Sequence, residues 1–300
     1  MEILVGLALL GKITLQWLVD GNSFSERYKI TVLASQVDSD LTDFPVYVDL
    51  NSMPSAFFNT VRSNGGDIII TESDSVTKVP VELVVIDVVA KMGELHFKGN
   101  ISSSIDTNFF VYVGNTNLSQ PSRTATFGSE NVWDSNYRVV QHMQQDPSGS
   151  APQMIDSTSN GFNGTSAGSM TSADLVPGQI ADNLDFDGTD DAIEAGDAAD
   201  IGDNNHTLEF WMKIDSLADQ GSPIATQDTS ANDFIGFNVF KNAQKLQFIT
   251  RPASEPTLLL NLITTNNEFT STIDRFSVVW VKEGFAFADQ TMYKNGATVT

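Results

Sequence analysis

The sequence predicts an all-β protein built from two β-sandwich domains in series. Apolar and polar residues alternate with the two-residue period of strands along most of the chain. Clusters of Gly, Asn, Asp and Ser separate these stretches, as expected for turns. Only residues 56–61 in the first half have the pattern of a helix, and it would be short. Short strands joined by such turns are typical of antiparallel sandwiches.

The first half contains six segments that we expect to form strands. They are residues 27–33, 44–50, 67–71, 79–89, 94–97 and 109–113. Residues 117–126 are polar and have no strand pattern, so we place a domain boundary at 127/128. The expected organisation is an N-terminal segment (1–22), a first β-sandwich (23–127) and a second domain (128–300).

The second half continues the strand pattern after a long polar stretch. We expect strands at residues 137–143, 183–186, 192–195, 207–214, 234–240, 245–250, 258–262 and 276–283. Residues 144–172 are rich in Ser, Gly, Asn and Asp, and a structureless loop of this length would be unusual. We therefore expect this stretch to wrap one face of the domain and to contain one or two short strands.

Composition excludes several classes of function. The 300 residues are enough for two hydrophobic cores. With 16 basic and 38 acidic residues the net charge is −22, which argues against binding to nucleic-acid phosphates. The chain has no cysteine, so it has neither disulfides nor thiolate metal sites, and this favours a microbial or viral source. No apolar run approaches the roughly 20 residues that span a membrane, so we expect no membrane span.

The N-terminus carries an apolar run that we interpret as an assembly element. No basic residue precedes the run, whereas a secretory signal normally has basic residues there; a degenerate signal sequence is the alternative. In an extended strand the run is apolar on both faces, as in a strand buried between two partners. We expect it to add as a strand to a neighbouring protomer or another protein. Its residues are Ile3, Leu4, Val5, Leu7, Leu9 and Leu10.

The first half carries a series of motifs in a fixed order. They are Arg27, Leu41-Thr42-Asp43-Phe44-Pro45-Val46, Asp67-Ile68-Ile69-Ile70-Thr71, Val79-Pro80-Val81-Glu82 and Val111-Tyr112-Val113-Gly114-Asn115. This series resembles an uncharacterised β-sandwich domain that is common in archaeal, bacterial and phage surface proteins. Val113 stands where that family has a second tyrosine. The family has no agreed biochemical function.

The second half carries a different series of motifs. They are Asp156-Ser157-Thr158-Ser159-Asn160, Asn163-Gly164-Thr165, Leu184-Asp185-Phe186-Asp187-Gly188, Asp190-Asp191, residues 207–213, Trp280-Val281 and Tyr293-Lys294-Asn295-Gly296. This series resembles the concanavalin A-like/laminin-G-like superfamily, which implies a jelly roll. That family normally has one or two further strands after the last motif. Their absence from this sequence implies an incomplete second domain or a sheet that a neighbour completes.

Two groups of polar residues are candidates for a metal site. Asp187, Asp190 and Asp191 could chelate calcium, the only cofactor that we consider. The favoured alternative is a hairpin turn in which these carboxylates cap backbone N–H groups. The same two interpretations apply to Asp156 with Asn160 and Asn163, and there too the turn is favoured.

The remaining candidate residues give weaker signals. Trp211 and Trp280 could stack on sugars, but both lie in strand patterns and we expect them to be buried. Trp133, near the domain boundary, is the better candidate for exposure, and packing at the domain interface is the alternative. The three histidines, His96, His142 and His206, are far apart without the spacing of metal ligands, and we assign them to structure.

These observations favour a structural virion protein, such as a tail, fibre or capsid-decorating component. Its lectin-like domain would contact host-surface glycans or other virion proteins, and we expect a homo-oligomer located in the virion. The alternative is a secreted or cell-surface carbohydrate-binding adhesin. A glycoside hydrolase is third, because the two carboxylates it requires are not evident: the strand at 207–214 offers only Glu209. We therefore do not expect an enzyme.

Deletion of residues 1–12 tests the role of the N-terminal run. Both domains should stay folded by circular dichroism. Oligomer formation or incorporation into particles should be lost, because the deletion removes the apolar strand that the neighbouring protein would bury. Size-exclusion chromatography with light scattering measures the oligomer. A deletion variant that assembles like the wild type would show that the run is only a tail or a vestigial signal.

Overall fold

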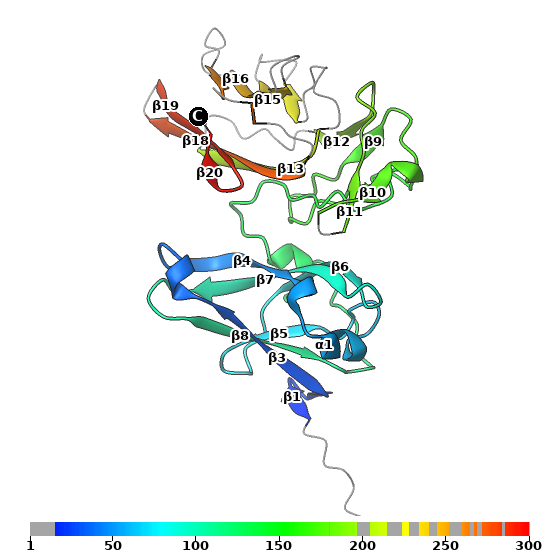
Figure 1. Cartoon of the computed structure of the whole chain (residues 1–300). Helices are drawn as coiled ribbons and strands as arrows, with labels where there is room; N and C mark the ends of the chain where they lie inside the picture. The colour runs from blue at the N-terminus through cyan, green and yellow to red at the C-terminus, as the bar shows by residue number, and fades with distance from the viewer. Residues whose placement is uncertain are drawn as a thin grey trace, which may run out of the picture. The chain divides into compact units, whose positions relative to one another are not determined.

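The computed structural model describes most of the chain as two compact units (Figure 1). The described residues are 16–179, 181–196, 205–214, 224–227, 234–239, 245–251, 260–264, 267–268, 272–283 and 286–299. The first unit holds the described residues up to Gln144 together with 156–161 and 181–183, and the second unit holds the rest. The N-terminal run from Ile3 to Leu10 lies outside the described residues, so the assembly strand stays a prediction.

The first unit contains two three-stranded antiparallel sheets. One has the order β3-β8-β5, formed by Glu26–Val32, Thr107–Val113 and Ile69–Glu72. The other has the order β4-β7-β6, formed by Leu41–Asp49, Met92–Ile101 and Val81–Asp87. All six strands expected in this half are present, which confirms the strand assignment there.

Shorter elements flank these sheets. The hairpin of β1 (Trp17–Val19) and β2 (Asn22–Phe24) precedes them, and α1 (Ser55–Thr60) is the expected helix. Three short 3₁₀ helices lie in the loops: η1 (Ala34–Gln36), η2 (Leu50–Ser52) and η3 (Ser129–Asn131).

The core of the first unit is enclosed by the inner faces of the two sheets. Val46 and Val48 of β4 and Phe97 of β7 belong to one buried cluster with Phe109 and Val111 of β8. The rings of Phe97 and Phe109 pack edge to face with centroids 4.6 Å apart. Each fully buried side chain of this kind contributes roughly 1.5–3 kcal/mol. Because successive strand residues point to opposite faces, the residues between these core positions point to the outer face of the β4-β7-β6 sheet.

Residues 128–144, which we call the covering segment, cover that outer face and form no strand. A strand was predicted at 137–143, and this prediction is wrong, because side chains of the loop 156–160 satisfy backbone groups that a ladder would otherwise pair. The carboxylate of Asp156 accepts a hydrogen bond from Val140 N (3.0 Å), and the amide of Asn160 donates to the carbonyl oxygens of Tyr137 and Arg138 (3.0 and 2.9 Å). Residues 128–144, expected to open the second domain, thus belong to the first unit.

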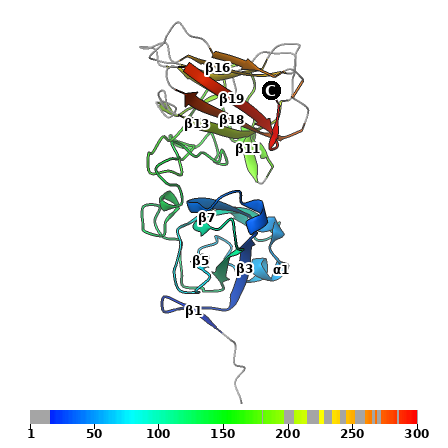
Figure 2. The same cartoon turned by 90° about the vertical axis from the view of Figure 1, so that its left-hand side faces the viewer.

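The second unit is also built from antiparallel strands. Four-stranded sheets have the orders β13-β18-β19-β20 and β14-β15-β16-β17, and β12 pairs with β9. The two larger sheets lie one above the other in both views (Figures 1 and 2). The strands are β9 (Thr165–Ala167), β10 (Leu175–Pro177), β11 (Asp182–Leu184), β12 (Ala192–Glu194), β13 (His206–Met212), β14 (Ala225–Gln227), β15 (Phe234–Val239), β16 (Leu246–Arg251), β17 (Leu260–Ile263), β18 (Asp274–Glu283), β19 (Ala286–Lys294) and β20 (Ala297–Thr298), and η4 (Ser172–Asp174) is a 3₁₀ helix.

The all-β prediction is therefore confirmed, whereas the jelly-roll topology of the second domain stays a prediction. The polar stretch at 144–172 contains one short strand, β9, and an isolated bridge between Met154 and Gly164, in line with expectation. In the described part of the chain, no helix has both the length and the apolar character needed to cross a membrane.

Candidate functional site

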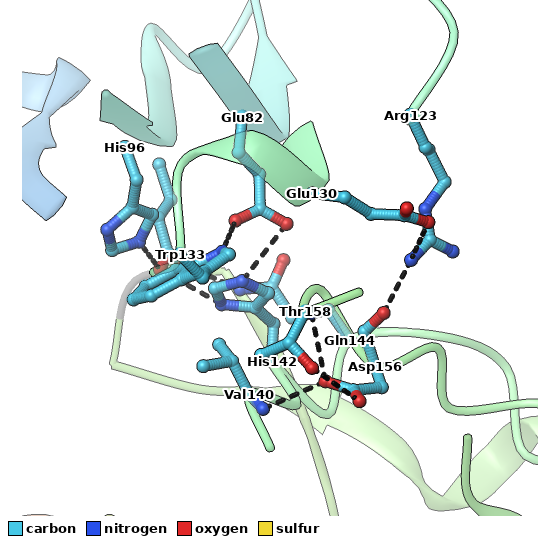
Figure 3. A network of polar contacts seen from close by, with 11 residues as sticks. Glu82, His96, Arg123, Glu130, Trp133, Val140, His142, Gln144, Asp156 and Thr158 are labelled. Carbon is cyan, nitrogen blue, oxygen red and sulfur yellow. Dashed lines mark hydrogen bonds and ion pairs between the residues drawn. The ribbon is translucent and has the colours of Figure 1, made fainter. Parts of the chain in front are cut away.

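The outer face of the β4-β7-β6 sheet carries a nearly buried group of charged and aromatic side chains (Figure 3). Strand register sets its composition: His96 of β7 lies opposite Tyr47 of β4 on one side and Glu82 of β6 on the other. Glu94 precedes His96 by two residues and therefore points to the same face. The covering segment adds Trp133, His142 and Gln144. We call Glu82, Glu94, His96, Trp133, His142 and Gln144 the Glu–His cluster.

Glu94 is the centre of this cluster. Its Oε1 atom lies 2.8 Å from Nε2 of His96 and 3.3 Å from Nδ1 of His142. Its Oε2 atom accepts a hydrogen bond of 2.9 Å from the side-chain amide of Gln144. The Glu94 side chain is only 8% exposed, so these contacts replace most of its hydration.

Glu82 holds the other side of His142. Trp133 donates its indole N–H to Oε2 of Glu82 at 2.6 Å. Oε1 of Glu82 lies 3.5 Å from Nε2 of His142, an ion-pair distance that is too long for a good hydrogen bond. The Trp133 ring also packs on His96, with ring centroids 5.1 Å apart. The cluster therefore links two strands of the sheet to the segment that covers them.

Burial and charge act in opposite directions on the cluster. Burial alone would raise the pKa of Glu94, but its contacts with His142 and His96 outweigh this and lower the pKa to about 2. Burial alone would lower the pKa of His142, but the carboxylates of Glu82 and Glu94 raise it to about 9. In the absence of other ligands, His142 is a cation at neutral pH between two carboxylates.

The donor atoms of Glu94, His96 and His142 are also close enough to share a metal ion, since they lie within 4.8 Å of one another. The histidines had been assigned to separate structural roles, yet the fold brings His96 and His142 together. Their spacing in the sequence gave no sign of this, because His142 lies in a segment without regular structure. The only indication in the sequence was the two-residue spacing of Glu94 and His96, which places both side chains on the same face of one strand.

In the acidic turn at Asp187, Asp190 and Asp191, the carboxylates of Asp187 and Asp191 cap backbone N–H groups, as the favoured turn interpretation expects. The turn does not close the expected hairpin, because β11 pairs with β10 and β12 pairs with β9. Oδ1 of Asp187 accepts from the backbone N–H groups of Thr189 (2.7 Å) and Asp190 (3.3 Å), and these bonds contribute to lowering its pKa. Oδ2 of Asp191 accepts from the backbone N–H of Asp187 at 3.0 Å. Carboxylate oxygens of the three residues also lie within 4.8 Å of one another, so calcium binding stays a prediction.

The second polar group has a similar structural role. Asp156 is fully buried and accepts hydrogen bonds from the backbone N–H and the hydroxyl of Thr158 (3.0 and 2.8 Å), in addition to the bond from Val140 N. Together with Asn160 it fixes the covering segment, which agrees with the favoured turn interpretation. Asn163, the third residue of this group, lies in the second unit.

Trp211 lies on an exposed face of the second unit, so the prediction that it is buried is wrong. Trp211 is 46% exposed. Successive side chains of a strand point to opposite faces, and the neighbouring Phe210 points inward, where it stacks on Phe276 with ring centroids 5.8 Å apart. Trp211 therefore points outward. The side chain of Trp280 lies outside the described part of the structure.

Polar side chains accompany Trp211 on the same face of β13 and β18. Arg275 lies directly opposite Trp211, and Ser277 lies opposite Glu209. The Ser277 hydroxyl donates to Oε2 of Glu209 at 3.0 Å, and Nη1 of Arg275 lies 3.8 Å from Oε1 of Glu209. We call Trp211, Glu209, Arg275 and Ser277 the Trp211 face.

Comparison with known proteins gives no assignment, since no known family, curated protein or solved structure matches this chain. Both family resemblances therefore stay expectations from the sequence.

The shifted pKa values predict how the stability of the metal-free first unit depends on pH. His142 has a higher pKa in the folded state, so its stabilisation is complete below about pH 6.5 and is lost as the pH rises towards about 9. Glu94 has a lower pKa in the folded state, so its contribution is complete above about pH 4.5 and is lost as the pH falls towards about 2. Both contributions to stability are therefore complete only between about pH 4.5 and about pH 6.5.

Urea unfolding in the presence of EDTA, at about pH 5.5 and about pH 9, measures this dependence. The wild type should unfold at lower urea at the higher pH, and His142→Gln should show a smaller difference because it lacks the titrating group. His206→Gln, outside the cluster, is the matched control and should behave like the wild type. Equal pH dependence in wild type and His142→Gln would contradict the prediction.

Proposed function

We propose that the chain is a structural virion protein, such as a tail, fibre or capsid-decorating component, whose second unit contacts glycans of the host surface. The observation that carries the glycan contact is the exposure of Trp211 beside Arg275 and Glu209. The assignment to a virion is supported by the two family resemblances, the strong acidity and the absence of cysteine.

The chemistry of the Trp211 face suits a sugar. The indole ring offers a large, rigid apolar surface for the C–H face of a sugar ring. Beside it, Glu209 accepts hydrogen bonds and Arg275 donates them, which is the pairing needed by neighbouring hydroxyl groups. Their side chains are 52% and 40% exposed and only 3.8 Å apart at the closest oxygen and nitrogen, so both remain accessible to a ligand. A few placed polar groups beside an apolar surface are the usual composition of a small-ligand site.

The first unit suits a structural role. The chain that leaves its last strand is fixed as far as Gln144 by the Glu–His cluster and by Asp156. The alternative, a secreted or cell-surface adhesin, uses the same Trp211 face and differs in where the protein is located.

A binding measurement with matched variants tests the glycan contact. The wild type should bind a subset of glycans on an array, and Trp211→Ala should weaken binding to them by at least about tenfold, which is 1.4 kcal/mol. Phe186→Ala is the control, because Phe186 is an equally exposed aromatic residue of the second unit at 46%. Equal binding by wild type and Trp211→Ala, or no glycan bound by the wild type, would contradict the proposal.

Mass spectrometry of purified particles separates the virion from the adhesin. Peptides of this chain should be present in virions at a fixed ratio to the other structural proteins. Their absence from particles, together with their presence in the cell envelope or the medium of an uninfected microbe, would favour the adhesin.

A further inference from the structure

We propose that Glu94, His96 and His142 bind one divalent transition-metal ion of the zinc type, which ties the covering segment to strand β7. This inference is independent of the proposed function, because the cluster lies wholly within the first unit.

The ligand atoms already converge. Nε2 of His96 and Nδ1 of His142 lie 2.8 and 3.3 Å from the same oxygen of Glu94. In a tetrahedral zinc shell with bonds of about 2.0–2.1 Å, neighbouring ligand atoms are about 3.3 Å apart. Small side-chain adjustments would therefore open the space for an ion. Two imidazoles and one carboxylate are a donor set that zinc and its neighbours accept, whereas calcium prefers oxygen ligands only.

The residues around these three atoms have the arrangement expected of supporting groups. A histidine that binds a metal through one nitrogen usually contacts a carboxylate through the other, which orients the ring. Here Glu82 lies at the far nitrogen of His142, and Trp133 in turn fixes Glu82 with its indole N–H. Gln144 likewise holds the oxygen of Glu94 that the histidines leave free. Glu82, Trp133 and Gln144 are therefore positioning residues in this proposal.

Charge balance also favours a divalent ion. Glu82 and Glu94 place two negative charges on side chains that are each 8% exposed. One imidazolium compensates only one of them, whereas a divalent cation with neutral imidazoles compensates both. In addition, the amide oxygen of Gln144 is buried and has no hydrogen-bond partner. A water molecule in the fourth coordination position could donate to such an acceptor.

The ion would have a structural role. Two ligands come from β7 and one from the covering segment, so binding would cross-link parts of the chain that are far apart in sequence. Because the unfolded chain has no preformed site, such binding stabilises the folded state.

Metal titration of the full chain, stripped with EDTA and dialysed, tests the proposal. Zn²⁺ should bind with a stoichiometry of one by calorimetry, and Co²⁺ should give the visible absorption bands of a four-coordinate ion, displaced by Zn²⁺. His96→Gln and His142→Gln should each lose binding by about 100-fold or more, because each removes a ligand. Glu82→Gln should weaken binding by about 10- to 100-fold, because it removes a supporting carboxylate.

Two controls distinguish this site from others on the protein. His206→Gln removes a histidine outside the cluster, and Asp187→Asn alters the acidic turn; both should bind Zn²⁺ like the wild type. Binding that persists in the His96→Gln/His142→Gln double variant, or a stripped wild type that binds neither ion, would overturn the proposal.

A measurement on the wild type covers the case in which a cluster variant does not fold. In ¹H–¹⁵N spectra of the histidine rings, one equivalent of Zn²⁺ should shift the signals of two of the three histidines. Assignment by His206→Gln should show that the unshifted signal belongs to His206. A shift at His206, or no shift, would refute the site without any cluster variant.

Discussion

Glu82 and Glu94 lie nearly buried on the same face of one sheet, and the arrangement of the first unit depends on how these two charges are compensated. A carboxylate removed from water is destabilising unless hydrogen bonds and opposite charges replace its hydration. The sheet itself supplies only His96. The remaining compensation comes from the covering segment, through the imidazole of His142, the indole of Trp133 and the amide of Gln144. The carboxylates and the covering segment are thus mutually dependent.

This dependence explains why the covering segment has no regular structure. A strand would place its N–H and C=O groups in a ladder and alternate its side chains between two faces. Here His142 and Gln144 direct their side chains at the sheet. Backbone groups within residues 137–140 are bound by Asp156 and Asn160. Loop 156–161 acts as a second support from further along the chain.

The two units use strand parity for opposite purposes. In the first unit, the outward-facing positions of β7 are covered by chain and become a buried polar cluster. In the second unit, the outward-facing positions of β13 stay open, so Trp211 is exposed between polar neighbours. The same alternation therefore yields a structural cross-link in one unit and a candidate contact surface in the other. The acidic turn at Asp187 satisfies its own backbone and contributes to neither.

The sequence by itself determined the all-β class, all six major strands of the first unit, the helix near residue 56 and the turn at Asp187, because alternation and turn chemistry are local properties. It placed Trp211 in a strand but could not tell which face of that strand would be covered, since this depends on the neighbouring sheet. It also could not associate His142 with Glu94 and His96, because the segment that carries His142 has no period to read. Only the tertiary structure decided that this segment returns over the sheet, for the physical reason that two buried carboxylates require a partner from elsewhere in the chain.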